Sequence, residues 1–350
     1  MKLHRPDPIP VHAAQTVDRK AAPEQVATRL RDGEVLLVTD HYGTGVRILD
    51  QLLVLMPAPP GDAPFAVRQD HRRALRDASL RLLAPIKNHR LDLHDANTIG
   101  FLKKLYPDMP SFFLPFIQAQ ELHGAWSKYL EGVHLPVLGH RVHPFYGTYA
   151  PTRMAHLEVF GTWLSQYKGP RTRAVDVGTG CGVLALMLCR AGFERVLATD
   201  LNPNAVESVS HEVRRLPSAP PIDVACGDLL SRIDKPVELI VFNPPWLHGE
   251  IDGLIARALQ YDDGFFERFF DQAVERLTPD GRLVIIFSNV GQLVQPQRPH
   301  PILAELERGR LRQVQLMNRR IKPPQPESGP RRRTKEKVQV WELALASATA

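Results

Sequence analysis

Residues 174–182 read AVDVGTGCG, a short apolar run that leads into three glycines spaced two apart. The run predicts a strand, and the apolar residues at 183–191 predict a helix directly after it. Glycines at such a junction let the backbone turn tightly and approach a ligand where any Cβ would collide. The dinucleotide-binding pattern has glycine or alanine as its sixth residue, where this chain has Val183, so the spacing argues against a nicotinamide cofactor.

Beyond this junction, short β-branched runs alternate with helical patterns, as in a parallel sheet with crossover helices. The expected strands are 174–177, 195–199, 222–225, 238–242 and 282–287, and the expected helices are 183–191, 204–214 and 264–277. Two further alternating runs, 312–318 and 337–345, follow without a helix between them, which predicts antiparallel neighbours. The predicted fold class is therefore α/β.

The first third of the chain has a different pattern. Apolar residues three and four apart predict helices at 24–31, 46–56, 71–86, 96–106 and 112–132. One strand is expected at 34–40, and a proline-rich linker at 57–64. We expect a mostly helical N-terminal domain at 1–135 that serves substrate recognition or as a lid, a connecting segment with a leading helix at 136–170, and the sheet domain at 171–350.

Composition excludes several classes of protein. The chain has 350 residues, 43% of them hydrophobic, which is enough for one large core or two modest ones. No apolar run approaches the roughly 20 residues that cross a bilayer, and the first thirty residues lack the apolar block of a secretory signal. The three cysteines match neither a disulfide framework nor a zinc knuckle. We expect a cytoplasmic protein with no membrane contact.

The net charge of +6 is concentrated in one segment. Residues 308–337 carry eleven Lys or Arg against Glu327 and Glu336, so the rest of the chain is net negative. Arg331, Arg332 and Arg333 stand in a row there. Such a segment either contacts a polyanion by neutralising phosphates or is a solvated loop, and the sequence leaves both interpretations open.

Acidic residues follow the second and third expected strands of the sheet. Asp200 ends the second strand, where a carboxylate can accept both hydroxyls of a ribose. Asp228 follows the third strand and can accept a hydrogen bond from an adenine amino group. One isolated acid of this kind is more often a helix cap. Three consecutive strands that end in suitable residues indicate a nucleoside-binding site.

The fourth strand ends in the tetrad Asn243, Pro244, Pro245 and Trp246, or NPPW. A planar nitrogen, in an amide or an aromatic amine, is a poor nucleophile because its lone pair is delocalised. A site that activates it must therefore accept its N–H hydrogens. The Asn243 side-chain oxygen and the Pro244 carbonyl are two such acceptors, and successive prolines hold them rigid by fixing φ. Trp246 would stack on the flat substrate and exclude water.

With these motifs in this order, residues from about 143 to 345 resemble a class I S-adenosylmethionine-dependent methyltransferase. The matching branch, the methyltransferase small domain, carries an Asn-Pro-Pro-aromatic motif and methylates glutamine amides in proteins or exocyclic amines of adenine. The resemblance implies a Rossmann-like, seven-stranded methyltransferase sheet with its last strand antiparallel, and S-adenosyl-L-methionine as cofactor. The fourth motif position is usually Tyr or Phe, and Trp246 at this position leaves the substrate open.

The resemblance also assigns roles to residues of this chain. The three glycines of the loop would line the methionine moiety, Asp200 would hold the ribose, Asp228 would face the adenine, and Asn243 would position the nucleophile. The implied cofactor-binding residues are Asp176, Gly178, Thr179, Gly180, Gly182, Asp200, Leu201, Asn202, Asp228, Leu229 and Asn243. The implied catalytic residues are Asn243, Pro244, Pro245 and Trp246.

Two clusters upstream of the glycine loop have more than one interpretation. The aromatic residues Tyr146 and Tyr149 indicate a lid over substrate or cofactor, with Trp246 as a third substrate contact, or else simple packing between domains. His140 and His143 are spaced three apart, but Gly139 and Pro144 make this a loop without a Cys or acidic partner nearby, so we predict no metal site.

The combined prediction is an enzyme that transfers the methyl group of S-adenosylmethionine to a planar nitrogen of a protein or an RNA. One alternative is the same chemistry on a small molecule, with the N-terminal domain closing over it. A second is a non-catalytic nucleic-acid-binding protein that keeps the methyltransferase scaffold and uses the basic segment. The intact tetrad argues against the second alternative.

Overall fold

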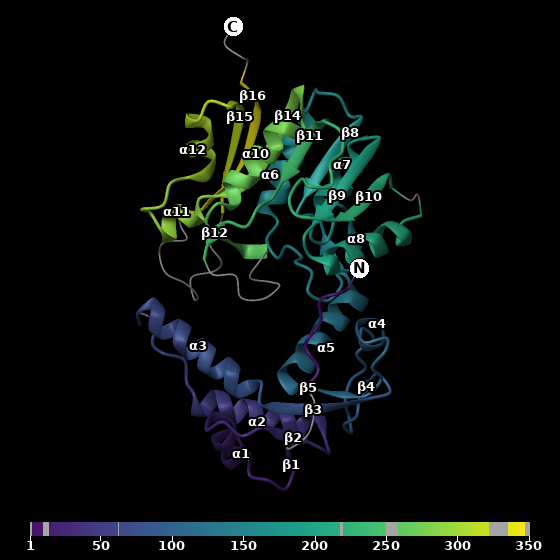
Figure 1. The fold of residues 1–350 in the computed structure, drawn as a ribbon, viewed down its shortest axis with the longest axis vertical. Helices are drawn as coiled ribbons and strands as arrows, with labels where there is room; N and C mark the ends of the chain where they lie inside the picture. Colours follow the sequence, from purple (N-terminus) through teal and green to yellow (C-terminus); the bar gives the residue numbers. More distant parts are fainter. Residues whose placement is uncertain are drawn as a thin grey trace. The chain divides into compact units, whose positions relative to one another are not determined.

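The computed structural model describes residues 2–9, 14–61, 63–217, 220–249, 258–321 and 335–346. The chain divides into two compact units (Figure 1). The N-terminal unit comprises Leu3–Lys128, and the C-terminal unit comprises Tyr129–Ala350 together with Met1–Lys2. None of the helices in the described ranges is both long and apolar enough to cross a membrane.

A seven-stranded sheet forms the centre of the C-terminal unit, with the strand order β10-β9-β8-β11-β14-β16-β15 (Figure 1). The strands are β8 (Arg173–Val177), β9 (Arg195–Asp200), β10 (Ile222–Cys226), β11 (Val237–Phe242), β14 (Leu277–Ser288), β15 (Leu311–Arg320) and β16 (Lys337–Leu345). The five strands from β10 to β14 are parallel, whereas β16 is antiparallel to both of its neighbours. The chain order reverses on either side of β8, and in open α/β sheets ligands bind beyond the carboxyl ends of the strands at such a point.

Helices cover both faces of this sheet because its central strands are apolar on both sides. In β11, Leu239 and Val241 pack into one core with helices α6 (Ala155–Gln166) and α7 (Val183–Arg190). Ile240 and Phe242 pack into the other core, with α10 (Phe265–Arg276). The remaining helices of the unit are α8 (Pro203–Arg215), α11 (Val290–Val294) and α12 (Pro301–Glu307). Two small pairs of strands complete it, namely β6 (Val133–Leu135) with β7 (His140–Val142) and β12 (Leu247–His248) with β13 (Gln260–Tyr261). The α/β class predicted from the sequence is confirmed.

The N-terminal unit combines helices with a sheet, so the expected mostly helical domain is not confirmed. It contains a five-stranded sheet of β1 (Gln15–Val17), β2 (Leu36–Val38), β3 (Leu82–Lys87), β4 (Arg90–Leu91) and β5 (Phe112–Pro115). Its helices are α1 (Pro23–Arg31), α2 (Tyr42–Leu55), α3 (Phe65–Ser79) and α4 (Leu102–Leu105). Helix α5 (Phe116–Glu131) begins in this unit and ends in the next.

The sheet of the N-terminal unit was not predicted because its strands are short apolar runs. Such runs fit a buried strand as well as a helix. The predicted helix at 71–86 ends at Ser79, and Leu82–Lys87 forms β3 between β2 and β5. Leu82, Leu83 and Ala84 are buried in succession, as in a central strand covered on both faces. The predicted helix at 112–132 likewise starts only at Phe116, after the strand β5.

Candidate active site at the strand ends

The register of the central sheet brings four predicted segments to one edge. Val177, the last residue of β8, pairs with Thr199 on one side and with Phe242 on the other. Cys226 in turn pairs with Asp200. The glycine loop, Asp200, the residues around Asp228 and the NPPW tetrad therefore follow neighbouring strand ends directly. Sequence reasoning predicted this convergence, because parallel strands end on a common edge.

The glycine loop adopts backbone conformations that disfavour other residues. Gly178, Gly180 and Gly182 have φ values of 62°, 53° and 84°, in the left-handed region. A Cβ on Gly180 would lie 3.2 Å from the carbonyl oxygen of Tyr149, and one on Gly182 would lie 3.0 Å from a methyl group of Val209. Gly182 is also the N-cap of α7. The loop thus needs glycine for its conformation and for the close approach of neighbouring chain segments.

Asp176 holds the loop from inside the fold. The side chain is fully buried, and its Oδ2 accepts hydrogen bonds from Thr179 Oγ1 at 2.7 Å and from Ala185 N at 3.0 Å. Burial raises the pKa of this carboxyl group to about 7. Asp176 and Thr179 therefore connect the glycine loop to the first turn of α7, which is a positioning role in this structure.

Asp200 joins the ends of β8 and β9. Its Oδ2 accepts a hydrogen bond from Gly180 N at 2.9 Å, and its Oδ1 accepts one from Asn202 N at 2.8 Å. Burial raises the pKa of this carboxyl group as well. A carboxylate offers about four acceptor positions, so two remain for donors from a ligand. Leu201 beside it is 44% exposed, which places an apolar surface next to those acceptors.

The segment after β10 is held to β9 by the side chain of Thr199. Leu229 is buried with φ at 49°, and its carbonyl accepts a hydrogen bond from Thr199 Oγ1 at 3.2 Å. Asp228 itself is exposed. Thr199, which sequence reasoning did not single out, thus positions the segment that carries Asp228.

The segment 143–147 is tied to helix α8 by four hydrogen bonds, which we call the α8 ladder. His143 N donates to Glu212 Oε2 at 3.1 Å, and Phe145 N donates to Ser208 Oγ at 3.0 Å. The ladder continues with Asn204 Nδ2 donating to the carbonyl of Tyr146 at 2.9 Å and Asn202 Nδ2 donating to that of Gly147 at 2.8 Å. Sequence reasoning missed the ladder, although polar residues four apart at 204, 208 and 212 were its visible signal.

The ladder places the predicted aromatic segment beside the glycine loop. The carbonyl of Tyr149 approaches Gly180, as described above, and the Tyr149 side chain is half-buried. Desolvation raises the pKa of its phenol, so the hydroxyl remains a neutral donor at physiological pH. Tyr146 and Tyr149 are thus close in space to predicted cofactor-binding residues.

The NPPW tetrad follows β11 at the same edge. Asn243 Oδ1 is buried and accepts no hydrogen bond within the described part of the chain. An unsatisfied buried acceptor costs about 1 to 3 kcal/mol, so this atom is set up to receive an N–H donor. Trp246 is partly buried against both hydrophobic cores, and its Nε1 donates to the carbonyl of Ile286 at 3.3 Å. Pro244 is buried and Pro245 is half-buried.

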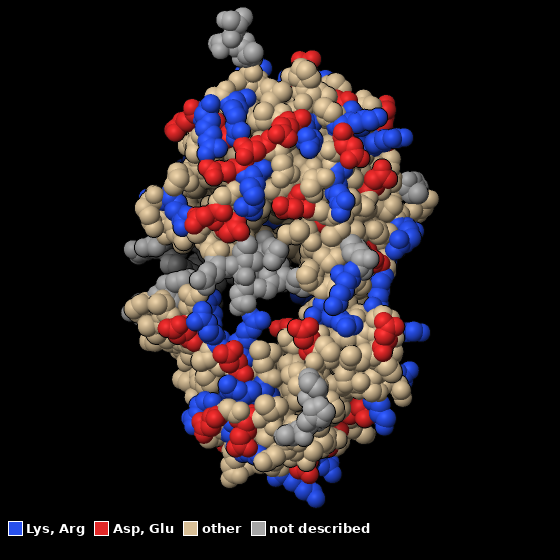
Figure 2. Space-filling model, in the orientation of Figure 1, with Lys and Arg blue, Asp and Glu red and all other residues tan. Residues whose placement is uncertain are grey.

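Three of the seven Lys and Arg residues in the described part of the basic segment form ion pairs with acidic side chains. Arg308 and Arg310 both pair with Glu305, and they also pair with Glu267 and Asp271 respectively. Arg319 pairs with Glu158. Lys, Arg, Asp and Glu side chains intermingle over the face shown in Figure 2. Arg331, Arg332 and Arg333 lie outside the described residues.

His140 and His143, the two histidines that were weighed as metal ligands, have other partners. His143 Nδ1 lies 3.3 Å from Glu212 Oε2. His140 Nδ1 contacts the carbonyl of Leu138 at 3.1 Å and Arg190 at 2.9 Å. His134 is exposed on β6.

Comparison with known proteins agrees with this geometry. Residues 161–298 match the family model described as Methyltransferase small domain. This region is therefore similar to that family. The resemblance predicted from the glycine loop, the two acids and the NPPW tetrad is thereby confirmed.

Two curated proteins are similar to this chain over part of their length. A ribosomal protein L11 methyltransferase of Exiguobacterium sibiricum is 40% identical over 80 residues, which cover 23% of this chain and 25% of that protein. A tRNA1(Val) (adenine(37)-N6)-methyltransferase of Tolumonas auensis is 31% identical over 133 residues, 37% of this chain and 55% of that protein. The chain thus spans between a quarter and about half of the length of these relatives.

A solved structure also matches. The ribosomal protein L11 methylase of Lactobacillus delbrueckii subsp. bulgaricus aligns with a TM-score of 0.40 and 17% sequence identity, over 57% of this chain and 82% of that chain.

Proposed function

We propose that the chain is an S-adenosylmethionine-dependent N-methyltransferase that acts on a planar nitrogen of a protein or an RNA. The observation that carries the proposal is the Oδ1 of Asn243 at the end of β11, two strand positions from Asp200, which is buried and has no hydrogen-bond partner among the described residues. An amide oxygen so placed accepts an N–H of the substrate and directs the nitrogen lone pair toward the glycine loop.

The residues at the edge of the sheet fit this cofactor. S-adenosylmethionine carries a methyl group that its sulfonium has already activated, so the protein's contribution is mainly positioning. The left-handed glycines let the backbone approach the methionine moiety, and the two free acceptor positions of Asp200 suit the ribose hydroxyls. Asp228 is assigned to the adenine, and Trp246 to one face of the substrate.

The substrate class rests on the relatives and on the chemistry of Asn243. The names of the two relatives refer to ribosomal protein L11 and to an adenine of a tRNA, and both substrates are macromolecules. We assign substrate recognition to the N-terminal unit and to Tyr146 and Tyr149. A small-molecule substrate is the alternative, and a non-catalytic nucleic-acid-binding protein is the second one. Cytoplasmic location and polyanion contact through Arg331, Arg332 and Arg333 stay predictions.

The proposal is tested by supplying the purified full chain with S-adenosylmethionine labelled on its methyl group. Three separate pools serve as acceptors, namely ribosomal and cytosolic proteins, deproteinised RNA, and a small-molecule extract. We expect label in the protein or the RNA pool, and none with the Asn243→Ala variant. Label confined to the small-molecule pool would select the alternative. No transfer to any pool, despite measurable S-adenosylhomocysteine binding, would favour the non-catalytic protein.

A further inference from the structure

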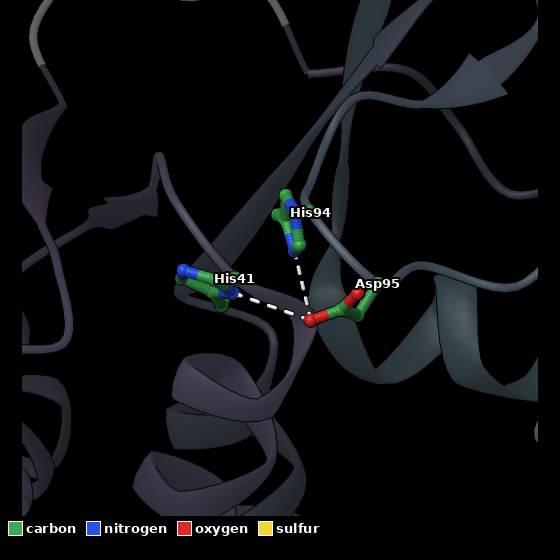
Figure 3. A group of neighbouring side chains, drawn as sticks. All are labelled: His41, His94 and Asp95. Atoms are coloured by element: carbon green, nitrogen blue, oxygen red, sulfur yellow. Dashed lines mark ion pairs between the residues drawn. The ribbon is translucent and has the colours of Figure 1, made fainter.

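Two histidines and an aspartate meet on the N-terminal unit (Figure 3). His41 is the N-cap residue of α2, whereas His94 and Asp95 lie in the loop that follows β4. His94 Nδ1 lies 2.8 Å from Asp95 Oδ2, and His41 Nδ1 lies 3.5 Å from the same oxygen. Figure 3 shows both imidazole rings directing a nitrogen toward this single carboxylate oxygen.

The backbone fixes this meeting point. Residues 41 and 94 form an isolated parallel bridge, in which Tyr42 N donates to the carbonyl of His94 at 3.0 Å and His94 N donates to that of Asp40 at 2.7 Å. Asp95 adopts a φ of 59°, which is uncommon outside glycine and turns its carboxylate back toward the two rings. The two segments are distant in sequence, so this proximity is a product of the tertiary fold.

The distances suit a transition metal. In a tetrahedral site with metal–ligand bonds of about 2.0 to 2.1 Å, neighbouring ligand atoms are roughly 3.3 Å apart. The distances from Asp95 Oδ2 to the Nδ1 atoms of His94 and His41, 2.8 and 3.5 Å, lie on either side of that value. One ligand atom from each residue lies within 4.8 Å of the other two. Rotations of side chains alone therefore suffice to admit an ion.

The charges and donor types also narrow the ligand. Two neutral imidazoles and one carboxylate carry a single negative charge, which suits a divalent cation. A carboxylate on the protein surface is ionised at neutral pH, and a histidine binds a metal through a neutral imidazole nitrogen. Imidazole nitrogens prefer zinc, nickel, cobalt or copper, whereas calcium and magnesium prefer a shell of oxygen atoms.

We propose that His41, His94 and Asp95 bind one divalent transition-metal ion, such as zinc. The ion links the residue before α2 to the loop after β4, and so clamps two loops of the N-terminal sheet. The side chains of His94 and Asp95 are 69% and 73% exposed, so the fourth position of the ion faces solvent and can take water. The proposal does not depend on the methyltransferase activity.

The experiment uses the full chain without a histidine tag, after treatment with a chelator. Calorimetric titration with Zn²⁺ should show one ion per chain. His94→Ala and Asp95→Asn should each weaken binding at least tenfold, because each removes one of three ligands. His134→Ala is the matched control, since it removes an exposed histidine on β6 and should leave the affinity unchanged. Asparagine tolerates the left-handed backbone at position 95, so Asp95→Asn should keep the loop conformation.

Cobalt substitution gives an independent measurement on the unmodified chain. Co²⁺ in a site of two imidazoles and a carboxylate should show visible absorption bands without the near-ultraviolet charge-transfer band of a thiolate ligand. The proposal is overturned by an absence of saturable Zn²⁺ binding, or by a thiolate band that assigns the ion to a cysteine. Equal Zn²⁺ affinity of Asp95→Asn and His134→Ala would also overturn it.

Discussion

The imidazole of His156 meets the indole of Trp246 edge to face, with ring centroids 5.8 Å apart and ring planes at 87°. His156 lies on α6 and is only 4% exposed, so this contact is an interior one. The indole is therefore fixed by His156 on one side and by the Nε1 hydrogen bond to Ile286 on the other. These interior contacts suit the role that we propose for Trp246, a fixed wall against one face of the substrate.

The first prediction concerns the pH dependence of stability. Burial lowers the pKa of His156 from its ordinary value of 6.5 to about 4, so the unfolded chain binds a proton there more readily than the folded one. Lowering the pH through this interval therefore favours unfolding. Relative to His156→Phe, the wild type should lose about 2 to 3 kcal/mol between pH 7 and about pH 4.5, as measured by urea unfolding. Other groups titrate in both proteins, so their contributions cancel in the comparison. A difference in the free energy of unfolding between the two proteins that does not change with pH would contradict the assignment.

The second prediction concerns Asp200. Alanine at this position removes the acceptor for Gly180 N and Asn202 N as well as the proposed acceptor for the ribose. S-adenosylhomocysteine affinity should fall by about 10- to 100-fold, or roughly 1.5 to 3 kcal/mol, in calorimetric titration. Asp223→Ala, at an exposed acid of β10, is the control and should bind normally. Unchanged affinity of Asp200→Ala would remove this carboxylate from the cofactor site.

The third prediction separates chemistry from binding at Asn243. Asn243→Ala should keep S-adenosylhomocysteine affinity within about twofold but lower turnover by two to three orders of magnitude, about 3 to 4 kcal/mol of transition-state positioning. The change deletes a buried acceptor that has no partner in the described structure, so no intramolecular hydrogen bond is lost with it. Retained turnover would move the chemistry to another residue.

The fourth prediction tests the α8 ladder. Ser208→Ala removes the hydroxyl that accepts the hydrogen bond from Phe145 N in a buried environment. This loss should lower the free energy of unfolding by about 1 to 3 kcal/mol. Ser210 lies on the same helix, and its hydroxyl donates to the carbonyl of Val206 in that helix. Ser210→Ala should therefore change stability by less than about 0.5 kcal/mol. Equal effects of the two substitutions would show that the ladder adds nothing to stability.

The fifth prediction concerns polyanion contact. If Arg331, Arg332 and Arg333 contact RNA phosphates, their joint replacement by alanine should weaken RNA binding. The slope of log affinity against log salt should become shallower by about 2 to 3. Arg308, Arg310 and Arg319 are already paired with acids, so the three central arginines carry the test. An unchanged rate of methyl transfer in the triple alanine variant would favour a small-molecule substrate.

In the C-terminal unit, the bounds of most strands and helices could be predicted from the sequence to within a few residues. Its signals are local, because a glycine-rich turn after a strand and a polar residue at each strand end appear in short windows. The strand at 337–345 has the bounds of β16, whereas β14 starts at Leu277 rather than near Arg282. Leu277 pairs with Val237, and the register then shifts so that Arg282 is the next residue to pair, opposite Leu239; no local pattern records this irregularity.

Features that depend on tertiary contacts were not predictable in this way. The sheet of the N-terminal unit is built from short runs such as Leu82–Lys87, whose burial on both faces removes the alternation typical of a strand. The contact of His156 with Trp246 and the cluster of His41, His94 and Asp95 join segments that are far apart in the chain. Their residue types are visible in the sequence, but their proximity follows only from the fold.

The position of β16 between β14 and β15 has a consequence for synthesis on the ribosome. β15 is made before β16, yet within the described sheet β15 pairs with β16 alone. Until residues 337–345 have been translated, the growing chain thus exposes the apolar edge of β14 at Leu283–Phe287 together with an unpaired β15. Unpaired strand edges favour aggregation, so we expect aggregation to compete with folding at this stage.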